Sequence, residues 1–307
     1  MSSIASFPIN PEFSESRFLQ DLEKGSAAIG APYSEETTRA ILETYGHNFR
    51  EGAVQLRATS RPGDALIYRL FTHGPIDALD IAVKHGLLAP DNPIAPTIIS
   101  WRSLWEDAYE QLDFAADKGV TSAFLFLGAP RGVKELLDAP NVPEAIKANK
   151  QIFDDHELEL VQAVGADYQA QRIAFYFISR GPLTPELAAR YCAMARSPPP
   201  SETLYDDMSI MLGTNPFFFM VSMDFATGKI VEIQFYILFP IELPGGRLPE
   251  VGPRLTTYWD VDCYEEEEMD ILGWCFVETG EQYLRADRGY CGGLRDILRD
   301  WRLMSVD

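Results

Sequence analysis

Residues 217–239 read FFFMVSMDFATGKIVEIQFYILF, two runs of aromatic and β-branched residues on either side of the polar segment DFATGK. Such a pair of runs around a glycine-containing turn predicts a β-hairpin. Both runs are apolar at nearly every position instead of alternating between apolar and polar residues. A strand of that composition is buried on both faces. We therefore expect a hairpin covered outside by helices and lined inside by aromatic side chains.

Four other stretches repeat this hairpin pattern, at 53–71, 112–128, 160–177 and 271–290. The five turns recur about every 55 residues, which indicates a repeated supersecondary unit. Ten antiparallel strands closed on one another would leave no sheet edge and would enclose a lumen wide enough for a ligand. We therefore expect an α+β fold, a ten-stranded antiparallel β-barrel made of five α-β-β repeats and surrounded by a ring of helices.

Helical segments are expected between and around the hairpins. The predicted ranges are 15–29, 34–49, 76–87, 98–111, 132–153, 184–196, 201–211 and 292–302. Ser34, followed by Glu36 and a periodic apolar run, is typical of an N-cap with an acidic first turn. The segment richest in proline and serine, SPPPSE at 197–202, lies between a helix and the fourth hairpin, so we expect one barrel domain over residues 1–307.

The chain of 307 residues carries a formal net charge of −20, which argues against nucleic acid or an anionic membrane as its partner. In so acidic a protein, cations gathered inside the barrel would stand out. The N-terminus has no basic segment followed by an apolar one, and no run of 18 apolar residues occurs. We therefore expect a soluble, cytoplasmic protein.

The chain contains four cysteines, Cys192, Cys263, Cys275 and Cys291, without CxxC or other metal-ligand spacing. Its four histidines are scattered. We expect free, mostly buried thiols in a reducing compartment and no metal site. The acidic run at 265–270 is typical of a solvated loop or helix end. The chain has no nucleotide-binding glycine motif and no GxSxG motif, so a nucleotide-binding fold and an α/β-hydrolase have no support.

Arg57 and Arg69 are equidistant from Gly63 in the first hairpin, so in a simple register they face each other across the strands. Like charges directly opposed are destabilising unless an anion lies between them. Two converging guanidinium forks would suit a diphosphate. In the alternative, both arginines lie outside the barrel and pair with helix carboxylates. The sequence pattern alone favours neither placement of the two arginines.

The fifth hairpin places Tyr283, Arg285 and Asp287 on one face of its second strand. If that face lines the lumen, it offers a phenol, a cation and a carboxylate in one row. An Asp among aromatic side chains would have a raised pKa unless Arg285 offsets the effect, and it could accept a proton. In the alternative, this face of the strand is exposed to solvent and its charged side chains form a row on the surface.

The second, third and fourth hairpins supply further candidates for the lumen. They are Ser122, Phe124, Gln162, Tyr176, Phe218, Met220, Glu232 and Tyr236. Aromatic faces can shield an allyl cation through the ring quadrupole. A plain hydrophobic core would use the same residues.

With these features the chain resembles the soluble aromatic prenyltransferases of the ABBA (αββα-repeat) fold, in particular the 4-hydroxyphenylpyruvate dimethylallyltransferase-like branch of aminocoumarin pathways. The resemblance covers nearly the whole chain and is clearest at 27–32, 61–64, 68–69 and 272–290. It implies transfer of a prenyl group, usually dimethylallyl, from its diphosphate to an electron-rich aromatic small molecule. We expect the protein to act as a monomer.

The resemblance also implies roles for individual residues. Arg57, Arg69 and Arg285 match diphosphate-binding cations, and Asp287 matches a glutamate proposed to accept the ring proton. Tyr176 and Gln162 match lumen residues. Ile67 stands where one branch of the family binds magnesium through an Asp. A magnesium-independent enzyme without a cofactor is therefore expected.

The sequence departs from the family pattern at Ser122, Gln169, Ala174 and Glu232, where a lysine, a basic residue, an asparagine and an arginine are expected. Glu232, which we also count as a candidate catalytic residue, is the most serious departure. One like-charged pair 4 Å apart costs roughly 4 kcal/mol at an effective dielectric constant of about 20. Glu232 is therefore protonated, or the donor lies elsewhere, or no diphosphate binds. In the last case the barrel would be a cyclase or a binding protein for a hydrophobic, prenylated or polyketide-like ligand.

Overall fold

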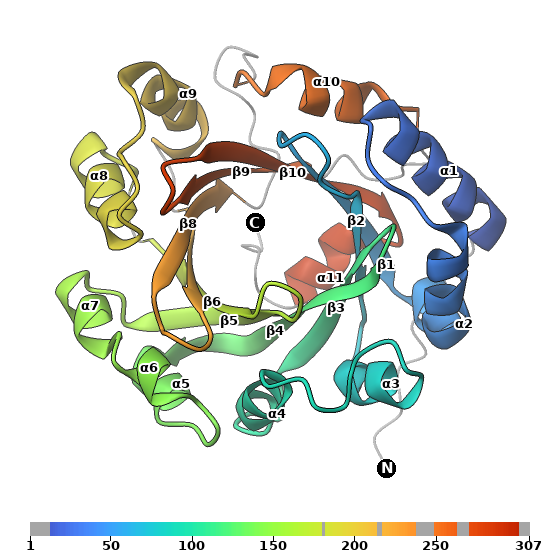
Figure 1. Cartoon of the computed structure of the whole chain (residues 1–307), viewed down its shortest axis with the longest axis horizontal. Helices are drawn as coiled ribbons and strands as arrows, with labels where there is room; N and C mark the ends of the chain where they lie inside the picture. Colours follow the sequence, from blue (N-terminus) through green and yellow to red (C-terminus); the bar gives the residue numbers. More distant parts are fainter. Residues whose placement is uncertain (1–12, 180–181, 214–216, 238–248, 263–269, 301–307) are drawn as a thin grey trace.

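The computed structural model describes residues 13–179, 182–213, 217–237, 249–262 and 270–300. Its ten strands pair in the order β1-β10-β9-β8-β7-β6-β5-β4-β3-β2 and close into a barrel. Each strand is antiparallel to both of its neighbours. Helices form a ring outside the strands (Figure 1). The expected barrel of five hairpins is confirmed.

The strand bounds follow the five predicted hairpins. The strands are β1 Ala53–Thr59, β2 Ile67–Phe71, β3 Tyr109–Ala115, β4 Gly119–Gly132, β5 Leu160–Asp167, β6 Arg172–Ile178, β7 Phe218–Asp224, β8 Ile230–Ile237, β9 Asp270–Val277 and β10 Gln282–Cys291. All eight residues of β8 are buried, as expected for a strand covered on both faces.

The helices lie before, between and after the hairpins in the sequence. They are α1 Glu15–Ala28, α2 Glu35–Glu51, α3 Ala78–Lys84, α4 Ala95–Arg102, α5 Val133–Leu137, α6 Glu144–Lys147, α7 Lys150–Asp155, α8 Pro185–Met194, α9 Glu202–Leu212, α10 Gly252–Asp260 and α11 Leu294–Asp300. Ser34 caps α2 as predicted, because its side chain accepts a hydrogen bond from the backbone N–H of Thr37.

Two predicted helices were wrong in extent, and one helix was not predicted. The range 98–111 contains the end of α4 and then the first residues of β3, because Tyr109–Ala115 pairs with β4. The range 132–153 forms three short helices, since Pro140 and Pro143 interrupt a continuous helix. Helix α10 was not predicted.

The register of the first hairpin differs from the expectation. Arg57 lies opposite Ile67, and Arg69 lies opposite Gln55, so the two arginines are diagonal neighbours and do not face each other directly. The hairpin is centred one residue before Gly63, which moves each cross-strand partner by two positions. A two-residue shift keeps every side chain on its face. Both arginines therefore still point to the same side of the sheet.

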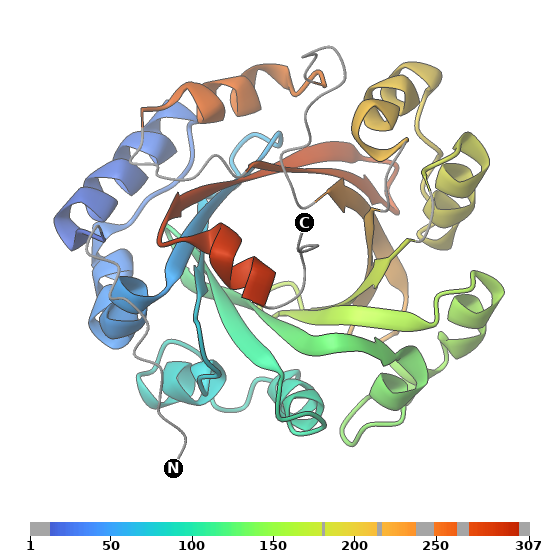
Figure 2. The ribbon, with the colours of Figure 1, turned by 180° about the vertical axis from the view of Figure 1, so that it is seen from behind.

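Buried apolar side chains form two layers. The larger lies between the helices and the outer face of the barrel and includes Phe18, whose ring meets those of Tyr68 and Tyr290 edge-on at centroid distances of 5.3 Å. The smaller layer lines the lumen and includes Ile297 and Leu298 of α11. Helix α11 thus covers one end of the barrel (Figure 2).

Cys192, Cys275 and Cys291 are buried, and Cys192 and Cys275 are free thiols, as expected. Cys263 and the acidic residues at 265–269 lie outside the described residues. Among the helices that the structure describes, none is both long and apolar enough to span a bilayer.

A buried ion pair lies outside the barrel, between β3 and α4. Glu110 is 1% exposed, and its Oε2 accepts a hydrogen bond of 2.8 Å from Nη1 of Arg102. Within the described part of the chain, its Oε1 has no hydrogen-bond partner. Burial raises the pKa of Glu110 to about 7, against the lowering effect of Arg102.

This raised pKa predicts a stability that depends on pH. The folded protein favours the protonated carboxyl, whose unfolded pKa is 4.5, so stability falls as pH rises from about 4.5 through about 7. The free energy of unfolding of the native protein and of Glu110→Gln is measured in urea at about pH 5 and pH 8. From the lower to the higher pH, the value for the variant should rise by about 2–3 kcal/mol relative to the value for the native protein. A difference independent of pH would contradict this assignment.

Candidate active site

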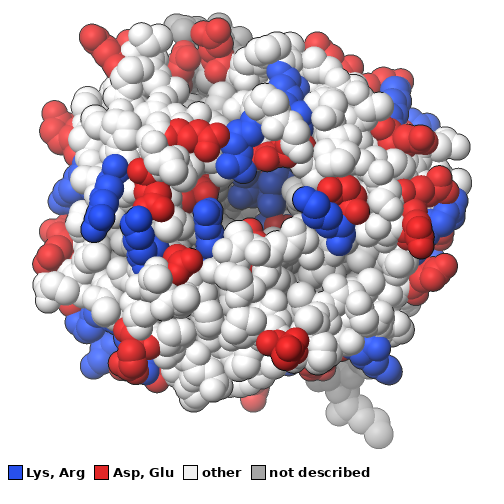
Figure 3. All heavy atoms as spheres, in the orientation of Figure 1, with Lys and Arg blue, Asp and Glu red and all other residues white. Residues whose placement is uncertain are grey.

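The lumen holds two adjoining cavities. The larger, of about 400 Å³, opens between the β1–β2, β3–β4 and β5–β6 turns, where Arg61, Lys118 and Gln169 line it. The smaller, of about 50 Å³, lies deeper and reaches Leu298 of α11. In Figure 3 basic side chains surround a hollow at the centre of this face and also lie inside it.

Asp113, on β3, joins two of the arginines. Its Oδ2 accepts hydrogen bonds of 2.8 Å from Nη1 of Arg57 and of 2.8 Å from Nη2 of Arg69, and its Oδ1 accepts a further bond from Nε of Arg69. Burial raises the pKa of Asp113, but the two guanidiniums outweigh burial and hold the pKa well below its usual range. The carboxylate is therefore ionised and fixes both arginines.

Asp287, on β10, joins a second pair of arginines, Arg57 and Arg285. Its Oδ1 accepts from Nε of Arg57 at 2.7 Å and from Nη2 of Arg285 at 3.0 Å, and its Oδ2 accepts from Nε of Arg285 at 2.8 Å. Burial raises its pKa, yet Arg285 and then Arg57 lower it more, so the net shift is downward. The condition set by the sequence, that Arg285 offsets burial, is met.

Arg57 thus contacts both carboxylates and ties the cluster together. The side chains of Arg57, Arg69 and Arg285 are 12%, 10% and 18% exposed, whereas those of Asp113 and Asp287 are 3% and 0% exposed. The guanidiniums therefore face the cavity with the carboxylates behind them. Nη2 of Arg57 is buried and has no hydrogen-bond partner among the residues that the structure describes. The cluster carries one net positive charge and retains unused N–H donors.

Two polar side chains complete the arginine side of the lumen. Ser122, at the position where a lysine was expected, donates from Oγ to Oδ2 of Asp113 at 3.1 Å. Gln234, on β8, accepts from Nη1 of Arg285 at 3.3 Å. Both bonds hold the cluster in place.

Aromatic side chains form a continuous surface next to the arginines. Phe124 lies under the Arg69 guanidinium, 4.7 Å from the ring centroid, and meets Tyr176 edge-on at 5.1 Å. Tyr176 meets Tyr236 edge-on at 6.1 Å, and Tyr236 stacks on Phe218 at 5.3 Å. These four rings and Gln162 line the smaller cavity.

Gly165 makes room for Tyr176. A Cβ built at this glycine would lie 3.2 Å from the tyrosine ring. The glycine therefore allows the ring to lie flat against β5.

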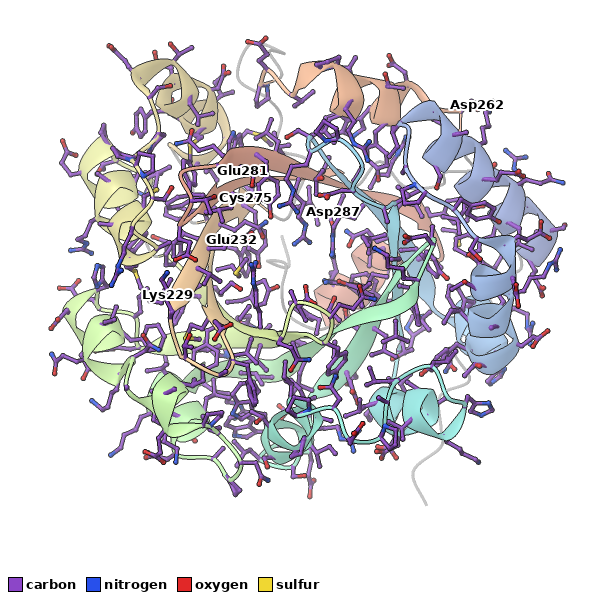
Figure 4. All side chains as sticks on the ribbon, viewed as in Figure 1. Lys229, Glu232, Asp262, Cys275, Glu281 and Asp287 are labelled. Atoms are coloured by element: carbon purple, nitrogen blue, oxygen red, sulfur yellow. The ribbon has the colours of Figure 1, made fainter. Side chains whose placement is uncertain are left out.

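Glu232 points into the lumen from β8 and is 8% exposed. Its Oε1 accepts a hydrogen bond of 2.8 Å from the hydroxyl of Tyr283, and its Oε2 is 3.6 Å from Nη1 of Arg172. Tyr283 in turn lies beneath Arg61, whose guanidinium is 4.1 Å from the ring centroid. Burial raises the pKa of Glu232, against the lowering effects of Tyr283 and Arg172. Figure 4 labels Glu232 and Asp287 on different parts of the barrel wall.

The structure brings the sequence-predicted residues together around the lumen. The residues that line the two cavities are Arg57, Arg69, Ser122, Phe124, Gln162, Tyr176, Phe218, Met220, Glu232, Tyr236, Tyr283 and Arg285. Asp287 lies directly behind them. The alternatives that placed the arginines on the exterior, or the fifth-hairpin residues in an exposed stripe, were wrong.

Sequence reasoning missed Asp113, Arg61 and Arg172. Asp113 could have been found, because it stands between the apolar residues Leu112 and Phe114 in the strand sequence YEQLDFA, and a carboxylate buried in such a strand requires a partner. Arg61 and Arg172 lie at turns, where a single charged residue gives no signal.

Among the described residues, no three His, Cys, Asp or Glu side chains are grouped so that they could hold a metal ion. Ile67 lines the larger cavity at the position where the resemblance implies a magnesium-binding Asp in another branch.

The chain is similar to known proteins over almost its full length. The family model described as "Aromatic prenyltransferase Orf2" matches residues 13–302. An aromatic prenyltransferase of Sclerotinia sclerotiorum is 36% identical over 294 residues, 94% of this chain and 95% of that one. The 4-hydroxyphenylpyruvate 3-dimethylallyltransferase of Streptomyces niveus is 31% identical over 296 residues, 96% of this chain and 90% of that one.

Among solved structures, the prenyltransferase PriB in ternary complex with L-tryptophan and dimethylallyl thiolodiphosphate superposes with a TM-score of 0.53. The match covers 90% of this chain and 95% of that one at 13% sequence identity. At this identity the likeness concerns the fold.

The Asp113 contacts predict a large effect of neutralising this carboxylate. Asp113→Asn should destabilise the protein by about 3–5 kcal/mol at neutral pH, because it leaves Arg57 and Arg69 buried beside each other without their shared anion. The control Asp91→Asn, at an exposed loop position, should stay within about 0.5 kcal/mol. Urea unfolding measures both. A loss below about 1 kcal/mol for Asp113→Asn would show that the cluster does not depend on this residue.

Proposed function

This chain belongs to the aromatic prenyltransferase Orf2 family, and from that premise we propose that it transfers a dimethylallyl group from its diphosphate to an electron-rich aromatic small molecule inside the barrel. The resemblance to soluble aromatic prenyltransferases found in the sequence is thereby confirmed. The donor's chain length and the roles of single residues are part of the proposal. We further propose that the protein acts as a monomer.

The observation that carries the proposal is the group of Arg57, Arg69 and Arg285 inside the lumen of a chain with net charge −20. A buried guanidinium group with unused N–H donors favours a phosphorylated ligand, because charge-assisted bonds to phosphate are short and strong. Asp113 and Asp287 fix the arginines before the ligand arrives, so little side-chain freedom is lost on binding. The donor diphosphate would lie against this side of the lumen.

The aromatic surface next to the arginines suits the other half of the donor. The bond between the allylic carbon and the diphosphate oxygen breaks, and its electron pair leaves with the diphosphate. Phe124, Tyr176 and Tyr236 then shield the allyl cation through their ring faces. A ring carbon of the acceptor attacks the cation, and the new C–C bond is followed by loss of the ring proton. The lumen excludes bulk water that would otherwise trap the cation.

Asp287 and Glu232 are the two candidate proton acceptors, and their surroundings differ. Both Asp287 oxygens accept hydrogen bonds from guanidiniums, and its pKa is lowered. Glu232 has a raised pKa and an oxygen without a hydrogen bond from a described residue. A carboxylate of higher pKa is the better base. We therefore assign the ring proton to Glu232 and a positioning role to Asp287.

Magnesium independence is part of the proposal. The guanidiniums supply positive charge where a metal would otherwise neutralise the leaving diphosphate. Ile67, at the position implied for a magnesium ligand, has no side-chain oxygen.

The second candidate function is a cyclase or a binding protein that has lost diphosphate handling. Its support is Glu232, a buried carboxylate that faces the same lumen. The three arginines favour prenyl transfer over this alternative, because a barrel for an uncharged hydrophobic ligand gains nothing from buried guanidiniums.

Binding of dimethylallyl thiolodiphosphate, measured by calorimetry in EDTA, tests the donor site. We expect native protein to bind it in the chelator, and Arg69→Gln and Arg285→Gln each to weaken binding by about 10- to 100-fold, since each removes a charged hydrogen-bond donor. Arg39→Gln, on the exposed face of α2, is the control and should bind within about twofold of native. Absence of native binding, or equal binding by all variants, would rule out the donor site.

A further inference from the structure

The lumen wall opposite the arginines is lined by unusually small residues. In the strand register, Gly165 of β5 lies beside Ala174 of β6, and Ala174 lies beside Ser222 of β7. The next residue across, on β8, is Glu232. All four line the larger cavity. The Tyr176 ring fills the space at Gly165, so the row leaves space in front of β6 and β7 and ends at a carboxylate.

This wall faces the donor site across the lumen. In the closed order of ten strands, β6 is five strands away from β1, and β7 is five strands away from β2. Arg57 and Arg69 lie on β1 and β2, so the small residues of β6 and β7 lie across the barrel from them. The same cavity of about 400 Å³ touches both sides. A planar molecule against the small residues would have one face turned to the donor side.

The carboxylate at the end of the row has one oxygen available. Oε1 of Glu232 accepts from the Tyr283 hydroxyl at 2.8 Å. Oε2 lies 3.6 Å from Nη1 of Arg172, too far for a hydrogen bond, and accepts none from a described residue. Glu232 is 8% exposed and lines the larger cavity, so this oxygen is within reach of a ligand bound there. A ligand that donates a hydrogen bond to Oε2 of Glu232 would satisfy this acceptor.

The charges around Glu232 do not favour a ligand that places a negative charge beside this residue. Arg172 lies between Asp167 of β5 and Asp224 of β7 in the register and also pairs with Glu232. Arg61 is paired with Asp64 at 2.9 Å and covers the Tyr283 ring. Arg172 and Arg61, the two cations that contact Glu232 or its partner Tyr283, are therefore already matched by carboxylates. A second carboxylate from a ligand would meet Glu232 without a free partner.

We propose that the aromatic acceptor lies against Ala174 and Ser222 and donates an O–H or N–H hydrogen bond to Glu232. This enzyme then selects phenols and N–H aromatic compounds that have no carboxylate beside the hydroxyl or N–H group. The inference rests on the proposed function and names its acceptor class.

Equilibrium binding of two matched ligands tests the inference without turnover. 2-Naphthol and 3-hydroxy-2-naphthoic acid share a ring system and a hydroxyl, and the second adds a carboxylate beside the hydroxyl. Because burial raises the pKa of Glu232, calorimetry is carried out at about pH 8, well above the ordinary pKa of a Glu side chain, with saturating dimethylallyl thiolodiphosphate. We expect native protein to bind the naphthol about 10- to 100-fold more tightly than the acid.

Three variants test which residues produce the preference for the naphthol over the acid. Glu232→Gln should reduce the preference to within about threefold, because the amide no longer repels the carboxylate. Ala174→Leu should weaken naphthol binding about tenfold or more by filling the space, while it leaves binding of the donor analogue within about twofold. Glu43→Gln, exposed on α2, is the matched control and should leave both ligands unchanged.

Tighter binding of the acid by native protein, a preference unchanged in Glu232→Gln, or naphthol binding unchanged in Ala174→Leu would each overturn the acceptor site. Retained binding of the donor analogue shows that each variant is folded. Failure of the proposed function is a separate result, because it appears as absence of donor binding by the native protein.

Discussion

Two buried carboxylates, Asp113 and Asp287, hold three guanidiniums in the lumen, and the proposed chemistry depends on this arrangement. An arginine inside a barrel is costly unless it is paired and hydrogen-bonded. Arg57 bridges the two carboxylates, so the group acts as one unit drawn from β1, β2, β3 and β10. The pairing lowers the pKa of both acids and keeps them ionised. The remaining positive charge faces the cavity, where an anionic donor would find it already oriented.

The barrel itself follows from a simpler constraint. Strands such as β8 are buried on both faces, so they need helices outside and a filled or ligand-sized lumen inside. Helix α11 covers one end with Leu298, and the hairpin turns leave the other end open. Arginine and aromatic side chains therefore share one lumen that is closed at one end, which suits a reaction that forms a charged intermediate.

The sequence predicted most of the fold because hairpins have local signals: aromatic and β-branched runs, turn residues and period-two alternation. It placed Arg57 and Arg69 on one face although their register was off by two residues, since a two-residue shift preserves the face. It did not reveal Asp113 as the shared partner, because a contact between β2 and β3 depends on the pairing of separate hairpins. The short helices between Val133 and Asp155 were missed because two prolines act over a few residues.

A crystal structure of the protein with dimethylallyl thiolodiphosphate tests the central claim most directly. Both phosphates should contact Arg57, Arg69 and Arg285, with Asp113 and Asp287 still bound behind them and the dimethylallyl group beside Tyr176. Phosphates bound away from these guanidiniums, or a lumen from which the ligand is absent at saturating concentration, would contradict the account.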